Sequence, residues 1–163
     1  MIKTSFLPIS DENSKILILG TMPGEQSLKL QQYYGHRGNQ FWKIIFQLFG
    51  KPLSQNYEER KNLLLTNSIA LWDVLQACER EGSSDNKIVK ETANDFHNFY
   101  KNHPKIKAVF LASGKAQTYY DTYVGRNSGL TFIQLPSPSS ANTWKTFEAK
   151  VEEWRIILQF LQK

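Results

Sequence analysis

The residues best suited to chemistry in this chain stand in short loops that follow apolar runs. The first loop, "GTMPGEQS" at residues 20–27, comes directly after "KILILG". Its glycines leave the main chain open to a ligand, and Thr21 adds a hydroxyl group beside them. Met22 stands at the centre, where a catalytic loop more naturally carries a polar side chain. We therefore expect this loop to act through its backbone amides and its shape.

A second segment, "YYGHRGNQFWK" at residues 33–43, mixes aromatic and hydrogen-bonding side chains. An exposed tyrosine stacks on a nucleic-acid base with a free energy of roughly 1 to 3 kcal/mol, and we expect one tyrosine of this segment to make such a contact. Phe41 and Trp42 fall on a helical stripe, which is typical of core residues. His36 stands without a partner for acid–base catalysis, so we expect His36 and Arg37 to face solvent and phosphate.

Two later loops carry groups that suit phosphate. The amides of residues 113–115, "SGK", would open a helix and form an anion site, to which Lys115 adds a positive charge. The loop "LPSPSSAN" at residues 135–142 has two prolines that stiffen it and several hydroxyl groups. Such a loop can contact phosphates or wedge into a duplex. An ordinary strand-to-helix turn capped by Ser or Asn is the alternative interpretation.

The composition favours an anionic partner and excludes several other classes. The 163 residues carry 20 Lys and Arg against 15 Asp and Glu, a formal charge of +5, which favours an anion such as nucleic acid without naming it. Neither a Walker loop nor a dinucleotide fingerprint is present. One cysteine cannot form an internal disulfide, and three scattered histidines show no metal-ligand spacing. No apolar run approaches the roughly 18 residues of a membrane span, and no secretory signal is evident, so we expect an intracellular, cytoplasmic protein.

Four apolar runs predict the strands that position these loops. Their continuous apolarity indicates strands that are buried on both faces. The runs occupy residues 15–20, 63–71, 107–113 and 130–135. Because segments with helical spacing lie between them, we expect a parallel sheet with right-handed crossovers. The prediction is an α/β protein, a three-layer α/β/α sandwich around a central four-stranded parallel sheet, formed by a single domain of residues 1–163.

Helices are expected between these strands. Helical spacing predicts one helix within residues 39–49, stopped by Gly50 and Pro52, and another within residues 92–104. The clearest pattern is that of the last helix, with Trp144, Phe147, Val151, Trp154, Leu158 and Leu161 on its apolar face. Ligands in parallel α/β sheets bind beyond the carboxyl ends of the strands. This rule brings together the loops at residues 20–27, 72–85, 112–117 and 135–142.

Three motifs, "GTMPG", "NQFWK" and "LPSPSSAN", resemble in type and order those of the uracil-DNA glycosylase superfamily. The resemblance is closest to the hypoxanthine-DNA (deoxyinosine) glycosylase branch and covers nearly the whole chain. It implies a short central parallel sheet flanked by helices. It also implies an enzyme that removes a damaged base from DNA by cutting the N-glycosidic bond, without a metal or an organic cofactor. The base would be hypoxanthine, with uracil as a further candidate.

The resemblance assigns roles to the motif residues. Relatives hold an Asp or Asn at the position of Met22, where it positions or activates the attacking water, and the deoxyinosine branch departs there as this sequence does. In that branch Asn39 is the polar residue expected to serve catalysis or base recognition, and an amide both donates to and accepts from a lactam edge. The expected base pocket comprises Gly20, Thr21, Met22, Pro23, Gly24, Tyr34 and Phe41.

DNA contacts are expected from the two later loops. The residues concerned are Ser113, Gly114, Lys115, Pro136, Ser137, Pro138, Ser139 and Ser140. The partner would be double- or single-stranded DNA whose deaminated base is flipped out of the stack, bound by a monomer associated with the nucleoid. A lyase would need a lysine nucleophile. The one lysine in the two central motifs is Lys43, which falls on the predicted helix after Trp42, so we expect a monofunctional hydrolase.

Two alternatives remain open from the sequence. A mismatch-specific uracil or thymine glycosylase shares "NxFWK" but normally carries a polar residue in place of Met22. A non-catalytic module that binds damaged DNA is the other alternative. Met22 favours this module and Asn39 opposes it.

Overall fold

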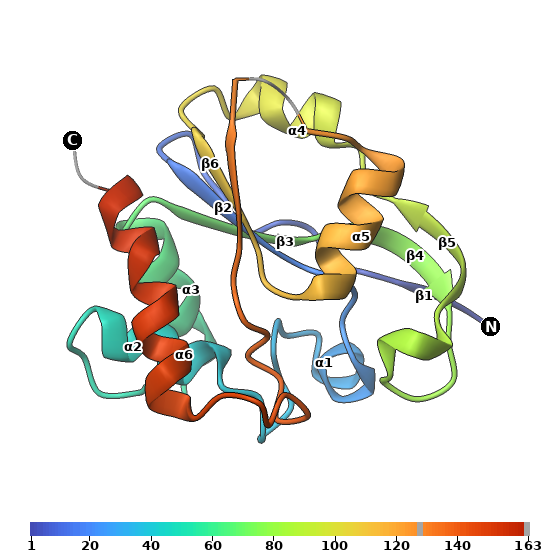
Figure 1. Cartoon of the computed structure of the whole chain (residues 1–163), viewed down its shortest axis with the longest axis horizontal. Coiled ribbons are helices and arrows are strands. Elements are labelled where there is room, and N and C mark those ends of the chain that lie inside the picture. Colours follow the sequence, from blue (N-terminus) through green and yellow to red (C-terminus); the bar gives the residue numbers. More distant parts are fainter. Residues whose placement is uncertain (127–128, 162–163) are drawn as a thin grey trace.

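A parallel sheet forms the centre of the fold in the computed structural model, which describes residues 1–126 and 129–161 (Figure 1). Its strands are β2 (Ile16–Gly20), β3 (Ile69–Asp73), β6 (Ala108–Leu111) and β7 (Thr131–Gln134). They lie in the order β3-β2-β6-β7, and each neighbouring pair is parallel. Strands β2, β3 and β6 are buried along their whole length, because side chains cover both faces of the sheet.

Helices cover the two faces of this sheet. On one face lie α2 (Phe41–Leu48), α3 (Tyr57–Thr66), α6 (Phe147–Trp154) and the 3₁₀ helix η2 (Arg155–Phe160), packed on Ile16 and Ile18. On the other face lie α4 (Phe96–Asn102) and α5 (Gly114–Tyr123), packed on Leu17 and Leu19. Successive side chains of β2 therefore enter opposite clusters, as the strand period of two requires. The predicted three-layer α/β/α architecture is confirmed.

A second, antiparallel sheet lies beside the first and was not predicted. Its strands are β1 (Ile2–Thr4), β4 (Leu75–Glu79) and β5 (Val89–Ala93), in the order β1-β4-β5. The interpretation of residues 72–85 as one loop is therefore wrong. Register shifts along β4 leave Leu75 and Cys78 buried with two residues between them, so the sequence lacks the alternation that marks a half-buried strand. The segment between β4 and β5 includes the 3₁₀ helix η1 (Asp85–Lys87).

Two predicted elements have different bounds in the structure. The run at residues 63–71 is not one strand, since α3 continues to Thr66 and a turn at Ser68, with φ of 63°, precedes β3. Apolarity alone cannot distinguish a buried helix end from a buried strand. The last helix begins at Phe147, and Trp144 is 95% exposed in the loop before it. Gly50, with φ of 65°, follows α2 as predicted.

The carboxyl ends of the parallel strands all lie at one edge of the sheet. The loop after β2 leads into the short helix α1 (Glu25–Leu30), and the loop after β6 leads into α5. The segment after β7 runs to α6 (Figure 1). No helix among the described residues combines the length and apolarity needed to cross a membrane.

Candidate active site

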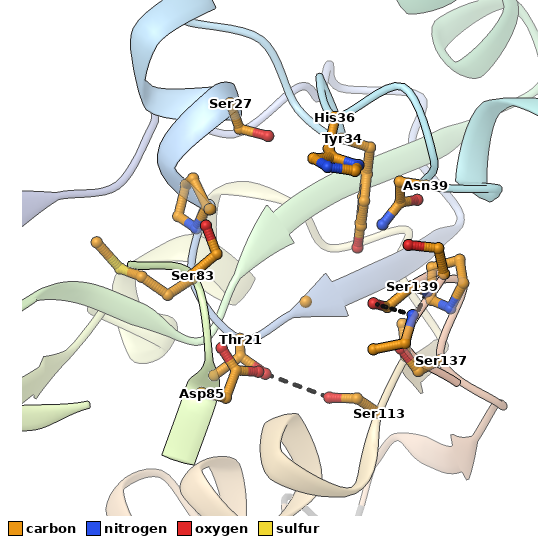
Figure 2. A pocket seen from close by; sticks show the side chains of 18 of the residues that line it. Thr21, Ser27, Tyr34, His36, Asn39, Ser83, Asp85, Ser113, Ser137 and Ser139 are labelled. Atoms are coloured by element: carbon orange, nitrogen blue, oxygen red, sulfur yellow. Dashed lines mark hydrogen bonds between the residues drawn. The ribbon is translucent and has the colours of Figure 1, made fainter. Parts of the chain in front are cut away.

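A cavity of about 680 Å³ opens at the carboxyl ends of the parallel strands (Figure 2). It is lined by segments that follow β2, β3, β6 and β7 and by the segment after β4. The predicted residues that line it are Gly20, Thr21, Met22, Pro23, Gly24, Tyr34, Asn39, Ser113, Ser137, Pro138, Ser139 and Ser140. The fold thus brings together residues from motifs that are up to 120 positions apart in the sequence, from Gly20 to Ser140.

Four predicted site residues do not line the cavity. Phe41 is fully buried, and its ring stacks on that of Tyr34 with centroids 4.2 Å apart. Phe41 therefore packs against the Tyr34 ring and does not reach the cavity. Gly114 and Lys115 form the first turn of α5 and are exposed. Pro136 accepts a hydrogen bond at its carbonyl from Trp154 Nε1 at 2.9 Å, so it holds the loop after β7 against α6.

The loop after β2 is held by a buried arginine. Arg80 follows β4 and is 5% exposed. Its guanidinium donates to the carbonyl oxygens of Pro23 at 2.5 Å and Gly82 at 3.0 Å, and forms an ion pair with Asp85 at 3.2 Å. Because all three contacts lie in the segments around the cavity, Arg80 fixes the second sheet to the "GTMPG" loop. Sequence reasoning missed this role, since a single arginine carries no motif.

Asn39 is oriented by a hydrogen bond to the backbone. Its Oδ1 accepts from the backbone N–H of Phe41 at 2.9 Å at the start of α2, and its own N–H donates to the His36 carbonyl at 3.0 Å. One acceptor position of the amide oxygen is therefore occupied. No described residue accepts a hydrogen bond from Asn39 Nδ2, and the side chain lies beside Tyr34 at the cavity (Figure 2). The amide thus presents an N–H donor to a ligand.

A buried lysine braces the serine loop at residues 136–142. Lys150 is 1% exposed, and burial lowers the pKa of its amine. The amine donates to Gln40 Oε1 at 2.8 Å and to the Ser139 carbonyl at 3.3 Å. The Gln40 backbone N–H donates to the Pro138 carbonyl at 2.8 Å. These bonds join the loop after β7 to the residue that follows Asn39.

Polar groups on the opposite wall of the cavity come from three segments. Thr21 Oγ1 lies 3.2 Å from Ser113 Oγ, which also accepts from the Ala116 N–H at 3.0 Å and so caps α5. Burial raises the pKa of Asp85, while the charge of Arg80, a hydrogen bond from Thr21 and the charge of Lys115 oppose this rise. The charge of Lys115 therefore lowers the pKa of Asp85 in the cavity lining, although Lys115 itself does not line the cavity.

Asp73, at the end of β3, is another lining residue that sequence reasoning missed. It is 4% exposed. Burial and, after it, the Asp85 carboxylate raise its pKa to about 7, against the opposing charge of Arg80. Its Oδ2 has no hydrogen-bond partner among the described residues. A single acidic residue directly after the apolar run "IALW" was the signal that could have identified it.

The described residues contain no group of three or more His, Cys, Asp or Glu side chains that could hold a metal ion. The lining of the cavity is formed by small, hydroxyl, amide and aromatic residues around two carboxyl groups. Such a cavity can hold a planar ligand by hydrogen bonds and shape.

The family model of the uracil DNA glycosylase superfamily matches residues 7–161. The chain belongs to this superfamily. Relatives named "Hypoxanthine DNA glycosylase" are 38% identical over 160 residues in Methanosarcina acetivorans and 40% identical over 155 residues in Methanosarcina barkeri. The alignments cover 98% and 94% of this chain, and 99% and 96% of the relatives.

The fold is also that of a solved relative. A solution NMR structure from Methanosarcina acetivorans, whose name assigns it to the uracil DNA glycosylases, matches with a TM-score of 0.85 and 37% identity over the whole of both chains. The sequence-based prediction of the superfamily is thereby confirmed. The substrate of such an enzyme is a base in DNA.

Proposed function

We propose that this chain is a single-domain, monofunctional DNA glycosylase that flips hypoxanthine out of DNA and hydrolyses its N-glycosidic bond, leaving an abasic site. The observation that carries the proposal is the Asn39 amide at the cavity, whose oxygen accepts from the Phe41 N–H and whose nitrogen donates to none of the residues that the structure describes. The names of the two Methanosarcina relatives support hypoxanthine as the base.

The chemistry required of the site is stabilisation of a departing base. Cleavage passes through an oxocarbenium-like state, and negative charge develops on the base as the bond breaks. A fixed N–H donor at that charge lowers the barrier, which is the role we assign to Asn39. Main-chain groups of Thr21 and Met22 hold the base and the attacking water. No described lysine lines the cavity, which supports direct hydrolysis over a Schiff-base mechanism.

The DNA strand would cross the rim of the cavity. Lys115 and the amides at the start of α5 lie on one side and meet phosphate there. On the other side the braced serine loop offers Ser139 and Ser140, followed by the exposed Trp144. We propose that this loop enters the space that the flipped base leaves. The substrate is double- or single-stranded DNA. The protein would act as a monomer at the nucleoid.

A panel of labelled oligonucleotides tests this function. Duplexes and single strands that carry deoxyinosine, deoxyuridine, deoxyxanthosine or a G·T mismatch are incubated with the protein, then treated with alkali to break abasic sites. We expect strand breaks at deoxyinosine, without breaks before the alkali step. Breaks at the G·T mismatch or at uracil alone would favour the mismatch-specific enzyme instead. Binding without breaks at any of these bases would indicate the non-catalytic module.

The matched variants are Asn39→Ala and Asn98→Ala. Asn98 lies exposed on α4, and that helix covers the sheet face opposite α2. We expect Asn39→Ala to slow base release about a hundredfold, which is typical for the loss of one donor at a developing charge. Asn98→Ala should react at the rate of the parent protein. Equal rates in the two variants would remove Asn39 from the mechanism.

A further inference from the structure

The attacking water needs a group that takes its proton, and the described residues 20–24 of the loop after β2 include no such side chain. Met22, at the centre of this loop, is 7% exposed and packs with Leu19 and Trp72. The Thr21 hydroxyl lies 3.2 Å from Ser113 Oγ. A hydroxyl or a backbone carbonyl can hold water but does not keep its proton. The proton acceptor therefore has to come from another segment of the cavity.

One carboxylate of the cavity lining is open to water. Among the described lining residues, the side chains that accept a proton near neutral pH are His36, Asp73 and Asp85. His36 Nδ1 accepts from the Gly38 N–H at 3.0 Å, so the neutral ring carries its proton on Nε2 and accepts no second one there. Asp73 is 4% exposed, and its Oδ2 is shielded from solvent. The Asp85 side chain is 31% exposed, so water reaches it.

The segment after β4 holds Asp85 in place. Arg80 Nη1 donates to Asp85 Oδ1 at 3.2 Å, and the Arg80 side chain is fully buried. Ser83 Oγ accepts from the Glu25 N–H at 2.8 Å. This bond and the one from Arg80 to the Pro23 carbonyl join the segment to the loop after β2 at two points. The carboxylate is therefore positioned, as a general base has to be.

The charges around Asp85 suit a base that works near neutral pH. Burial raises the pKa of the carboxyl group, while the charge of Arg80, a hydrogen bond from Thr21 and the charge of Lys115 limit the rise. A general base is most effective when its pKa lies near the working pH. The raised pKa makes Asp85 a stronger base than an exposed aspartate, and the two cationic side chains favour its ionised form.

Asp85 and Asn39 lie on opposite walls of the cavity (Figure 2). Asp85 stands beside Thr21, and Asn39 stands beside Tyr34. When water displaces a base from C1′, the base leaves from one face of the sugar and the water arrives at the other. The groups that serve the two events therefore flank the breaking bond, as the acid and the base of an inverting glycosidase do.

We propose that Asp85 is the general base of this site and accepts a proton from the attacking water. The water oxygen bonds to C1′ as the bond from C1′ to the base breaks, and the electron pair of that bond leaves with the base. The proton stays on Asp85 until solvent removes it, and the base leaves as the anion that Asn39 binds. This inference rests on the proposed function for the reaction.

Three variants separate proton transfer from structural support. Asp85→Asn retains an oxygen that accepts from Arg80, but the amide takes no proton. Asp85→Ala leaves space for a carboxylate from solution. Asp121→Asn is the matched control, because Asp121 is also paired with an arginine, Arg126 at 2.9 Å, and does not line the cavity.

The rate of reaction and the affinity for DNA are measured separately. The rate is that of single-turnover release of hypoxanthine from a deoxyinosine duplex. The affinity is measured with a duplex whose deoxyinosine carries fluorine at C2′, which destabilises the oxocarbenium state and prevents cleavage. We expect Asp85→Asn to slow release about a hundredfold, within the range of one general base, and to retain the affinity within about threefold. Asp121→Asn should match the parent protein in both.

Two results of these measurements would overturn the inference. One is an Asp85→Asn variant that releases hypoxanthine at a rate within about fivefold of the parent protein. The other is an affinity that falls as far as the rate, because Asp85 would then serve binding and not proton transfer.

Added formate tests the proton transfer by a readout that a structural role would not change. Formate supplies a carboxylate to the space that Asp85→Ala opens. We expect it to raise the rate of this variant at least about tenfold and to leave the rate of the parent protein unchanged. An Asp85→Ala rate that formate does not change would assign Asp85 a structural role and overturn the inference.

The parent protein decides on the proposed function in the same experiment. Release of hypoxanthine by the parent protein, with an unchanged rate in Asp85→Asn, would overturn the role of Asp85 and leave the proposed function standing. A parent protein that releases no base from any oligonucleotide of the panel would overturn both. The two failures are therefore distinguishable.

Discussion

Replacing Asn39 by aspartate separates two roles of this side chain. The carboxylate retains an oxygen that accepts from the Phe41 N–H, a bond of 2.9 Å at the start of α2. It loses the N–H donor and places a negative charge where the departing base becomes anionic. Loss of one donor at a developing charge costs about 2.7 to 4 kcal/mol, a factor of about 10² to 10³ in rate. Repulsion between the charges adds to this cost, so we expect Asn39→Asp to be at least about a thousandfold slower.

The assay is single-turnover release of hypoxanthine from a deoxyinosine duplex, together with thermal unfolding. Asn39→Asp should melt within about 2 °C of the parent protein. Asn39→Ala loses the bond to Phe41, worth about 1 kcal/mol, and should melt about 2 to 4 °C lower. We therefore expect Asn39→Asp, the more stable of the two variants, to be the slower one. A folded Asn39→Asp variant with a rate within fivefold of the parent protein would refute it.

Three further outcomes test other parts of the structure. Trp144→Ala removes an exposed ring at the rim of the cavity. The affinity for duplex DNA, measured by fluorescence anisotropy, should fall about tenfold because one stacking contact is lost. The melting temperature should not change. Lys150→Met leaves two partly buried acceptors, on Gln40 and Ser139, without their donor, and urea unfolding should report a loss of about 1 to 3 kcal/mol in the free energy of unfolding. Asp73 has a pKa raised by burial to about 7, so the folded protein binds its proton more tightly and stability falls from about pH 4 to pH 7. Asp73→Asn should therefore be more stable by up to about 4 kcal/mol near pH 8, with no difference near pH 4; an advantage that grows toward acid pH would contradict the cause assigned to the shift.

The central sheet could be predicted from the sequence because its strands are apolar on both faces. Ile16 and Leu17 enter opposite clusters, so the run contains no polar position that would suggest another structure. The antiparallel sheet lacks such a signal, since β4 carries register shifts and its exposed Gln76 lies between buried and half-buried neighbours. Trp144 was placed on the last helix by spacing alone, although it is exposed.

The candidate site could be predicted only where its residues form local motifs. Asn39 and the "GTMPG" loop were identified because each belongs to a short string of distinctive residues. Asp73, Arg80 and Lys150 act through contacts with residues far away in the sequence, such as the bond from Arg80 to the Pro23 carbonyl. Only the fold shows that these charges are buried. A buried charge has to be paired or bound to a ligand, which is why these three residues carry so much of the site.

Met22 gains a physical meaning from this arrangement. It is 7% exposed and packs with Leu19 and Trp72 in the core cluster beneath the cavity. Its side chain can therefore contribute shape but no proton transfer. In the proposed function the hydrogen bond to the departing base comes from Asn39. A site that lowers the barrier by stabilising the departing base gains specificity from the same contact, because only a base with an acceptor at the Asn39 donor can leave as a stabilised anion.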